Sequence, residues 1–325
     1  MKNRTLGRSG IEVSPLGMGC WAIGGVWKFL DGQGGWGEVD DQESIRAVHR
    51  ALDGGINFFD TAANYGTGHS EHILGRALSG KRDKAVIATK FGFSVNEADK
   101  QVRYHPHPDD VVKHVRAECE ASLKRLGTDY IDLYQLHVWD YPLEPVPALL
   151  AELEALVQEG KIRTYGWSTD SVEGARAFAQ GEHCVAIQHD LNFVNDAPAM
   201  LALCEELNLA SVNRTPLGRS ALTGKYTKET VFDQNDVRRA AWHHFGSMVE
   251  QLDAVRDILT SDGRTVAQGA LAWIWARSEQ TVPIPGIRTE AQAAENAAAI
   301  QFGPLTAAQM QQIEMLISRP ISATS

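Results

Sequence analysis

The sequence has few of the features that mark membrane, secreted or nucleic-acid-binding proteins. No run of 18 apolar residues occurs, so we expect no helix that spans a bilayer. Four scattered cysteines show no CxxC or zinc-type spacing, which favours reduced, buried thiols over a disulfide framework. Positive charge is in deficit, with 31 Lys and Arg against 41 Asp and Glu and a net charge of −10, so a nucleic-acid partner is not expected. The first ten residues lack an apolar signal-peptide core. These absences favour a cytoplasmic protein that acts on small molecules.

What the 325 residues do contain is a repeated alternation of short apolar strands and amphipathic helical patterns. Strands are expected at residues 15–21, 57–60, 85–91, 130–137, 164–168, 185–189, 210–214 and 281–285. Eight such units, with no Pro/Ser-rich linker or charge block between them, predict one α/β domain over residues 1–325, a (β/α)8 TIM barrel. The alternative is a doubly wound sheet, which would carry GxGxxG after its first strand. Gly17 and Gly19 begin that motif, but Ala22 stands where the third glycine belongs.

Four connections are unusually long, at residues 22–41, 92–108, 138–145 and 216–248. Long loops in compact domains are more often functional than decorative. In a barrel, three of these would follow strand ends on the C-terminal face, where active sites lie.

Three successive strands of this pattern end in an ionisable residue, namely Asp60, Lys90 and His137, and Tyr65 follows Asp60 in the same loop. Tyrosine has an ordinary pKa of about 10, and we expect Lys90 to lower it by stabilising the phenolate. Asp60 would pair with Lys90, and His137 would orient a substrate oxygen. Such a group delivers a proton to an oxygen while a carbonyl carbon is attacked. Because no activated Ser or Cys is evident, we expect the attacking species to come from a cofactor.

The stretches 57–66, 88–91 and 136–140, which carry these residues in order, resemble the aldo-keto reductase superfamily. The resemblance extends from Leu6 to Asn296 and is closest to the bacterial, soluble branch that includes inositol-operon and sugar reductases. It implies that Asp60, Tyr65, Lys90 and His137 form a catalytic tetrad with Tyr65 as general acid. It also implies a nicotinamide cofactor that lies across the barrel mouth without a Rossmann fold.

The resemblance also implies cofactor-binding positions. Ser168 and Gln188 match positions that hold the carboxamide, while Thr169 replaces an asparagine. Arg288 is expected to take a 2′-phosphate, because Gln292 stands at the position that is basic elsewhere, and NADPH is therefore favoured over NADH. The remaining expected contacts are Pro216, Leu217, Gly218, Ser220, Lys225, Gly286, Glu295 and Asn296.

Arg214 stands where many relatives stack an aromatic ring on the nicotinamide, and it is expected to contact cofactor, substrate or both. Together with Trp21 and Trp139 it suggests a sugar or another polar, even anionic, carbonyl substrate on an aromatic wall. Trp27, Trp36 and Trp242 are further candidates for that wall, and Lys28 for binding an anion. The competing interpretation makes the tryptophans packing residues and the substrate a generic aldehyde.

Two functional alternatives remain from the sequence. The same site could run in reverse as an aldose or alcohol dehydrogenase, or the chain could be a cofactor-binding regulatory subunit like the potassium-channel β-subunits. Three histidine clusters occur, at His69 and His72, His105 and His107, and His243 and His244. None has a second set of ligands at metal spacing, so no metal is expected. The oligomeric state cannot be inferred from the sequence.

Overall fold

The computed structural model describes residues 1–227, 229–232, 236, 238, 242–317 and 319. At its centre is an eight-stranded parallel sheet in which neighbouring strands follow one another in chain order. Its strands are β3 (Gly17–Gly19), β6 (Phe58–Asp60), β7 (Val86–Phe91), β10 (Ile131–Leu136), β11 (Ile162–Ser168), β12 (Cys184–Asp190), β13 (Ala210–Arg214) and β14 (Thr281–Pro283).

The sheet closes on itself between its first strand and the segment that follows its last. Gly19 forms a parallel bridge with Gly286, its N–H donates to the Pro285 carbonyl at 2.9 Å, and its carbonyl accepts from the Ile287 N–H at 3.2 Å. A doubly wound sheet would stay open and reverse its strand order at the middle. The predicted (β/α)8 barrel is therefore confirmed. The first strand was expected at residues 15–21, but β3 covers only Gly17–Gly19. It ends early because Trp21 already begins a 3-10 turn.

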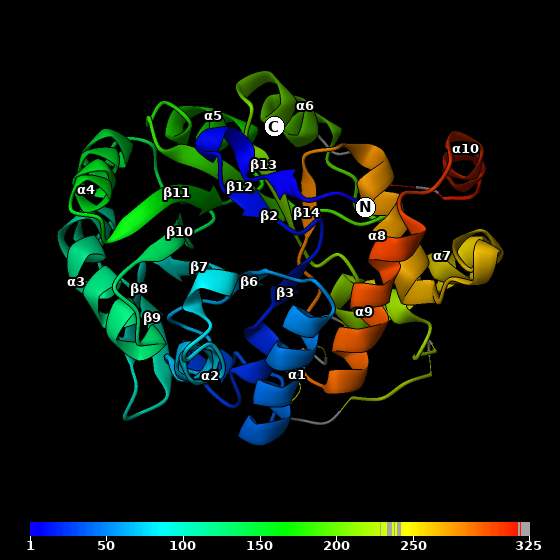
Figure 1. Ribbon diagram of the computed structural model, residues 1–325, viewed down its shortest axis with the longest axis horizontal. Helices are drawn as coiled ribbons and strands as arrows, with labels where there is room; N and C mark the ends of the chain where they lie inside the picture. Colours follow the sequence, from blue (N-terminus) through cyan, green and yellow to red (C-terminus); the bar gives the residue numbers. More distant parts are fainter. Residues whose placement is uncertain (228, 233–235, 237, 239–241, 318, 320–325) are drawn as a thin grey trace.

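Helices surround the barrel (Figure 1). They are α1 (Asp41–Asp53), α2 (His69–Ala77), α3 (Pro108–Leu126), α4 (Val146–Gln158), α5 (Val172–Phe178), α6 (Pro198–Leu207), α7 (Trp242–Leu259), α8 (Val266–Arg277), α9 (Glu290–Phe302) and α10 (Ala307–Leu316). Short 3-10 turns are η1 (Gly7–Ser9), η2 (Trp21–Ile23), η3 (Arg82–Lys84), η4 (Gly218–Thr223) and η6 (Ser261–Gly263). Within the described residues, no helix is both long and apolar enough to cross a membrane.

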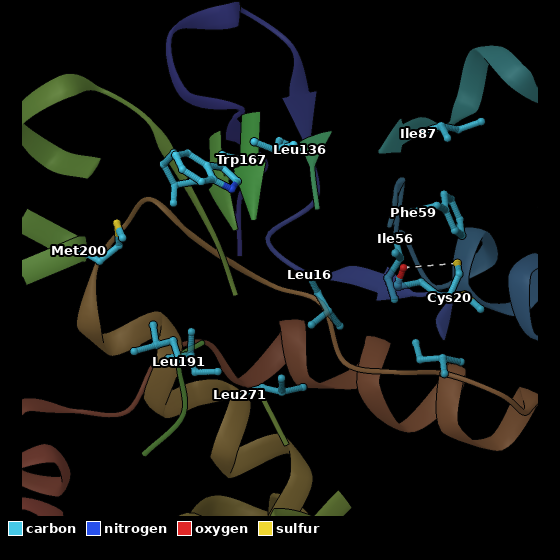
Figure 2. Close-up of a cluster of buried hydrophobic side chains, with 14 of the residues drawn as sticks. Leu16, Cys20, Ile56, Phe59, Ile87, Leu136, Trp167, Leu191, Met200 and Leu271 are labelled. Atoms are coloured by element: carbon cyan, nitrogen blue, oxygen red, sulfur yellow. Dashed lines mark hydrogen bonds between the residues drawn. The ribbon is translucent and has the colours of Figure 1, made fainter. Parts of the chain in front are cut away.

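Apolar packing lies on both sides of the barrel wall. The larger cluster fills the space between strands and helices, and Figure 2 shows part of it, including Leu136, Trp167 and Leu271. A smaller cluster fills the barrel interior and reaches the N-terminal hairpin of β1 (Arg4–Thr5) and β2 (Glu12–Val13). The hairpin is seated closely, since a Cβ on Gly7 would lie 2.1 Å from the Val185 carbonyl oxygen. One end of the barrel is thereby plugged, which leaves the C-terminal strand ends as the open face.

A second sheet stands at this open face, where the sequence predicted only loops. It has four strands in the order β5 (Gly32–Gln33), β4 (Lys28–Phe29), β9 (Gln101–Tyr104), β8 (Phe93–Asn96). The pairing joins the connection after β3 to the connection after β7, with Lys28 opposite Gln101. The long connections at residues 22–41 and 92–108 therefore form one ordered wall beside the barrel mouth.

Candidate active site

The C-terminal strand ends open into a cavity of about 750 Å³. Its walls come from the ends of the strands, from the second sheet, from η4 and from the first turns of α9. Among the residues that line it are Trp21, Asp60, Tyr65, His137, Trp139, Ser168, Gln188, Arg214, Pro216, Leu217, Ser220, Lys225, Gly286, Arg288, Gln292, Glu295 and Asn296. Most residues that the sequence singled out therefore surround one space, although they come from widely separated parts of the chain.

The four residues of the expected tetrad lie together at the barrel end of the cavity. Lys90 Nζ donates to Asp60 Oδ2 at 2.6 Å, to the Thr61 carbonyl at 2.9 Å and to Tyr65 Oη at 3.3 Å. The rings of Tyr65 and His137 approach edge to face, with centroids 5.8 Å apart. Lys90 is fully buried, so its ammonium is held by these oxygens in place of water.

Asp60 is itself fixed by two amide side chains that reach it across the barrel interior. Gln135 Nε2 donates to Asp60 Oδ1 at 3.1 Å and Gln188 Nε2 donates to the same oxygen at 2.8 Å. The sequence assigned Gln188 to the cofactor and gave Gln135 no role. Gln135 lies two residues before His137, and side chains two residues apart in a strand point to the same face. Gln135 is also paired with Lys90 on the neighbouring strand β7, so both side chains point to one face of the sheet.

Burial sets the direction of the pKa shifts of Tyr65 and His137, but not that of Lys90. It raises the pKa of Tyr65, and the opposing effect of Lys90 is too small to reverse the shift. Lys90 acts on the Tyr65 pKa in the expected direction, but burial outweighs it, so the expected net lowering is not found. Burial lowers the pKa of Lys90, but Asp60 and Tyr65 outweigh it and the net pKa is raised. Burial, with the charges of Lys90 and Arg214, holds the pKa of His137 well below its usual value, so its imidazole is neutral.

Aromatic rings form the wall above Tyr65. The Trp21 ring stacks near Tyr65 with centroids 6.1 Å apart and meets Trp36 edge-on at 5.0 Å, while its indole N–H donates to the Gly34 carbonyl at 2.9 Å. Trp139 is half exposed at the rim of the cavity. Trp27 also lines it, whereas the neighbouring Lys28 is exposed and does not. The side chain of Trp242 lies outside the described part of the chain.

Arg214, at the end of β13, lines the cavity with its charge already paired. Its guanidinium forms an ion pair with Asp170 and lies 3.8 Å from Asp190 Oδ2. Asp170 lines the cavity too, directly after Ser168 and Thr169. Sequence reasoning missed Asp170, although its place just beyond a strand end was a usable signal.

Ser168 and Thr169, which were both expected to bind the carboxamide, have different environments in the structure. Ser168 lines the cavity, but the Thr169 hydroxyl donates to the Trp139 carbonyl at 2.7 Å and accepts from the Ser171 N–H at 3.1 Å. Thr169 is fully buried and does not line the cavity. Its hydroxyl thus holds the loop that carries Trp139 in place.

The far end of the cavity has the features of an anion-binding site. In η4, Gly218, Arg219 and Ser220 all have positive φ, at 54°, 51° and 79°, and successive residues of this kind turn their N–H groups toward one side. Lys225 lies 3.7 Å from Glu295. These features, with the N-terminus of α9 beside them, suit a dinucleotide diphosphate.

At this far end of the cavity, Gln292 and Arg288 both form hydrogen bonds within the protein. The Gln292 side chain accepts from the N–H groups of Arg288 and Thr289 at 2.8 Å and 3.3 Å and completes the capping box of α9. The Arg288 guanidinium donates to the carbonyls of Trp36 and Glu38, which ties the loop after β3 to this wall. Within the described residues, no group of three or more His, Cys, Asp or Glu is arranged to hold a metal ion.

A barrel with this tetrad at its mouth defines the class of protein. Residues 15–318 match the Aldo/keto reductase family, and the chain belongs to that family, whose members are NAD(P)-dependent oxidoreductases acting on carbonyl and alcohol groups. It is 34% identical over 303 residues to the aldo-keto reductase YhdN of Bacillus subtilis strain 168, which covers 90% of this chain and 86% of that relative.

Two solved structures are similar over nearly their whole length. The glycerol dehydrogenase of Gluconobacter oxydans has a TM-score of 0.83 and 30% identity, covering 100% of this chain and 98% of that one. The holo form of an aldo-keto reductase from Bacillus halodurans has a TM-score of 0.79 and 28% identity, covering 100% and 99%.

Proposed function

We propose that the protein reduces the carbonyl group of a sugar or another polar carbonyl compound to an alcohol, with Tyr65 as the general acid. The observation that carries this proposal is the contact of Lys90 with both Asp60 and Tyr65 at the closed end of a large cavity. When bound, the nicotinamide cofactor supplies the hydride that reaches the carbonyl carbon.

The chain's own residues handle the proton. The Tyr65 hydroxyl donates a proton to the carbonyl oxygen, and Lys90 at 3.3 Å stabilises the phenolate that remains. Asp60 keeps the buried Lys90 charged and in place. His137 is neutral, so it can donate a hydrogen bond to the carbonyl oxygen without a competing positive charge. The raised pKa of Tyr65 supports reduction, because the acid form of the phenol persists at neutral pH.

Cofactor binding is assigned to the rest of the cavity. Ser168 and Gln188 would hold the nicotinamide end, and the η4 backbone with Lys225 would hold the diphosphate. Glu295 and Asn296 on α9 and the nearby Arg288 also line the cavity, and they would hold the adenosine end. We favour NADPH, because a guanidinium at a helix N-terminus suits a 2′-phosphate.

The walls support a polar substrate. Trp21 and Trp139 offer flat apolar faces for C–H groups, and Ser168 and Asn64 offer hydrogen-bonding groups beside them. The related glycerol dehydrogenase acts on a polyol, which agrees with this substrate class and favours alcohol oxidation as the second candidate direction. A substrate carboxylate would need a cation at this end of the cavity, for which Arg214 is the candidate.

Replacement of the proposed acid tests the function. We expect Tyr65→Phe to lower kcat for a panel of aldoses and aldehydes about 10²- to 10⁴-fold, because the proton donor is lost. The Kd for NADPH, measured by fluorescence titration, should be unchanged. Tyr104→Phe is the matched control, since Tyr104 lies on the second sheet outside the cavity lining.

Full turnover by the Tyr65→Phe variant would contradict the assignment of the acid. Cofactor binding without turnover of any member of the panel would favour the regulatory-subunit alternative. The panel also identifies the preferred substrate class.

A further inference from the structure

The cation beside the reacting end of the cavity is neutralised by the protein itself. Arg214 forms an ion pair with Asp170 on one side and lies 3.8 Å from Asp190 on the other. Asp190 also accepts a hydrogen bond from the Thr215 hydroxyl, so it is bound on two sides. Two carboxylates, one just after β11 and one at the end of β12, thus face the guanidinium at the end of β13.

Asp170 is held firmly in this arrangement. Its Oδ1 accepts the Asp190 backbone N–H at 2.9 Å while Oδ2 takes the Arg214 guanidinium. One side chain therefore connects the ends of three neighbouring strands, β11, β12 and β13. The Asp170 side chain is 57% exposed, and both of its oxygens are engaged at the rim of the cavity.

No other described side chain at the tetrad end leaves a free positive charge. Lys90 is bound by Asp60, and the imidazole of His137 is neutral. Lys28, the other cation considered for an anionic substrate, does not line the cavity. Arg219 acts on Asp190 electrostatically, but it is exposed on η4, the loop that we assign to the cofactor diphosphate.

We propose that Asp170 is a specificity-determining residue that sets the charge of the substrate: by neutralising Arg214, it makes the site favour neutral carbonyl compounds over anionic ones. An anionic substrate would lose water and meet the Asp170 carboxylate without an unpaired cation in return. A hydroxylated neutral substrate avoids this cost and can use Asp170 as a hydrogen-bond acceptor. The inference rests on the proposed carbonyl reduction and narrows its substrate class.

A pair of aldehydes that differ in charge and by one methyl group tests this. Succinic semialdehyde and its methyl ester share one carbon skeleton, and the ester removes the carboxylate charge. For the wild-type protein we expect kcat/KM for the ester to exceed that for the acid about tenfold or more, because a like charge at close range opposes binding. Asp170→Asn keeps the acceptor for the Asp190 N–H but removes one of the two carboxylate charges that face Arg214, so it should shift the ratio about tenfold toward the acid.

Two further variants separate the local effect from a general one. Asp140→Asn removes one negative charge from an exposed position near the same rim without touching Arg214, and it should leave the ratio unchanged. The double variant Asp170→Asn/Arg214→Ala should lose the gain for the acid, because the freed cation is absent. Melting temperatures of all variants check that the barrel is intact.

The ratio can also be measured without turnover. Both aldehydes can be titrated against the protein bound to the oxidised cofactor, which has no hydride to transfer, while tryptophan fluorescence is followed, since Trp21 and Trp139 line the cavity. A wild-type preference for the acid, or an unchanged Kd ratio in Asp170→Asn, would overturn the inference. If both aldehydes bind with the expected ratio and neither is reduced, the proposed function fails while the charge selectivity stands.

Discussion

The same burial acts in opposite directions on Tyr65 and His137. Removing water disfavours whichever form is charged, so the pKa of the phenol rises and the pKa of the imidazole falls. Both side chains are therefore neutral and can both donate hydrogen bonds to a substrate oxygen at neutral pH. Lys90 remains the charged group between them and Asp60.

These shifts predict different pH profiles for the two directions of the reaction. Reduction needs the phenol form of Tyr65, whose pKa is raised above its ordinary value of about 10. As the pH rises toward 10, loss of the Tyr65 proton should therefore not slow reduction. His137 is already neutral well below pH 6.5, so it should add no inflection near neutrality. Oxidation needs the phenolate form of Tyr65. The rate of oxidation should therefore rise as the pH increases toward 10, because more phenolate is present.

Single-turnover measurements in both directions check this. A fall in the reduction rate with a midpoint near neutral pH would contradict the protonation states that burial imposes. Tyr104→Phe should leave both profiles unchanged.

The site residues at strand ends could be predicted from the sequence. The residues that hold them by hydrogen bonds or ion pairs could not. Asp60, Lys90 and His137 stand at three successive strand ends, a pattern visible before any contact is known. Gln135 reaches Asp60 across the barrel interior, and Asp170 reaches Arg214 from two strands away. Such pairings depend on barrel closure and register, which composition and spacing do not determine.

Among the elements, the sheet at the barrel mouth was the main omission from the sequence prediction. β4 and β5 have two residues each, too few for an alternating pattern to register, and the partner β9 lies some seventy residues away. The alternation in β8 and β9 was available, because Phe93 and Val102 are buried while Ser94 and Arg103 are exposed. The barrel strands after the first were located from the sequence because each is a short apolar run that follows a helical segment.

A buried ion pair joins three elements behind Lys90. Glu71 of α2 is fully buried, accepts from the Thr89 hydroxyl of β7 and forms a 2.6 Å ion pair with Arg125 of α3. We expect Arg125→Met to lower the free energy of unfolding by about 3–5 kcal/mol, because Glu71 would be left buried without a counter-charge. Urea denaturation measures the loss.

The same helix supplies the control. Arg116 of α3 pairs with Glu152 and Glu159 on the exposed surface, with all three side chains 37–41% exposed. Arg116→Met should cost less than about 1 kcal/mol, since exposed pairs are screened by water and salt. Equal losses for both variants would show that burial of Glu71 is not what makes its pair important.

At the scale of the whole molecule, charge is sorted by location. The chain carries a net −10, yet its cavity is lined by Arg214, Arg219, Lys225, Arg238 and Arg288. Arg214, Lys225 and Arg238 have carboxylate partners within the described residues, whereas Arg219 and Arg288 have none there. Both of these lie in the half of the cavity that we assign to the cofactor. An acidic protein can thus draw an anionic dinucleotide into one half of its cavity and keep the other half electrically balanced.

Arg288 is the residue on which the choice between NADPH and NADH should depend. A guanidinium–phosphate hydrogen bond contributes about 1.5–3 kcal/mol, so we expect Arg288→Ala to raise the Kd for NADPH about 10- to 100-fold. The Kd for NADH should change little, because NADH lacks the 2′-phosphate. Rising salt should weaken NADPH binding to the wild-type protein more than to the variant.

Arg288 also holds the carbonyls of Trp36 and Glu38, so its loss could loosen the loop after β3 and weaken both cofactors. An equal rise in the two Kd values would assign Arg288 to that loop and refute its role in cofactor choice. Arg46→Ala is the matched control: Arg46 binds Glu290 in the first turn of the same helix, outside the cavity lining, so its loss should leave the NADPH to NADH ratio as it is. The side chains of Arg46 and Arg288 both lie near the N-terminus of α9, but only Arg288 lines the cavity. The comparison therefore separates direct binding of the phosphate from the long-range electrostatic effect of a nearby cation.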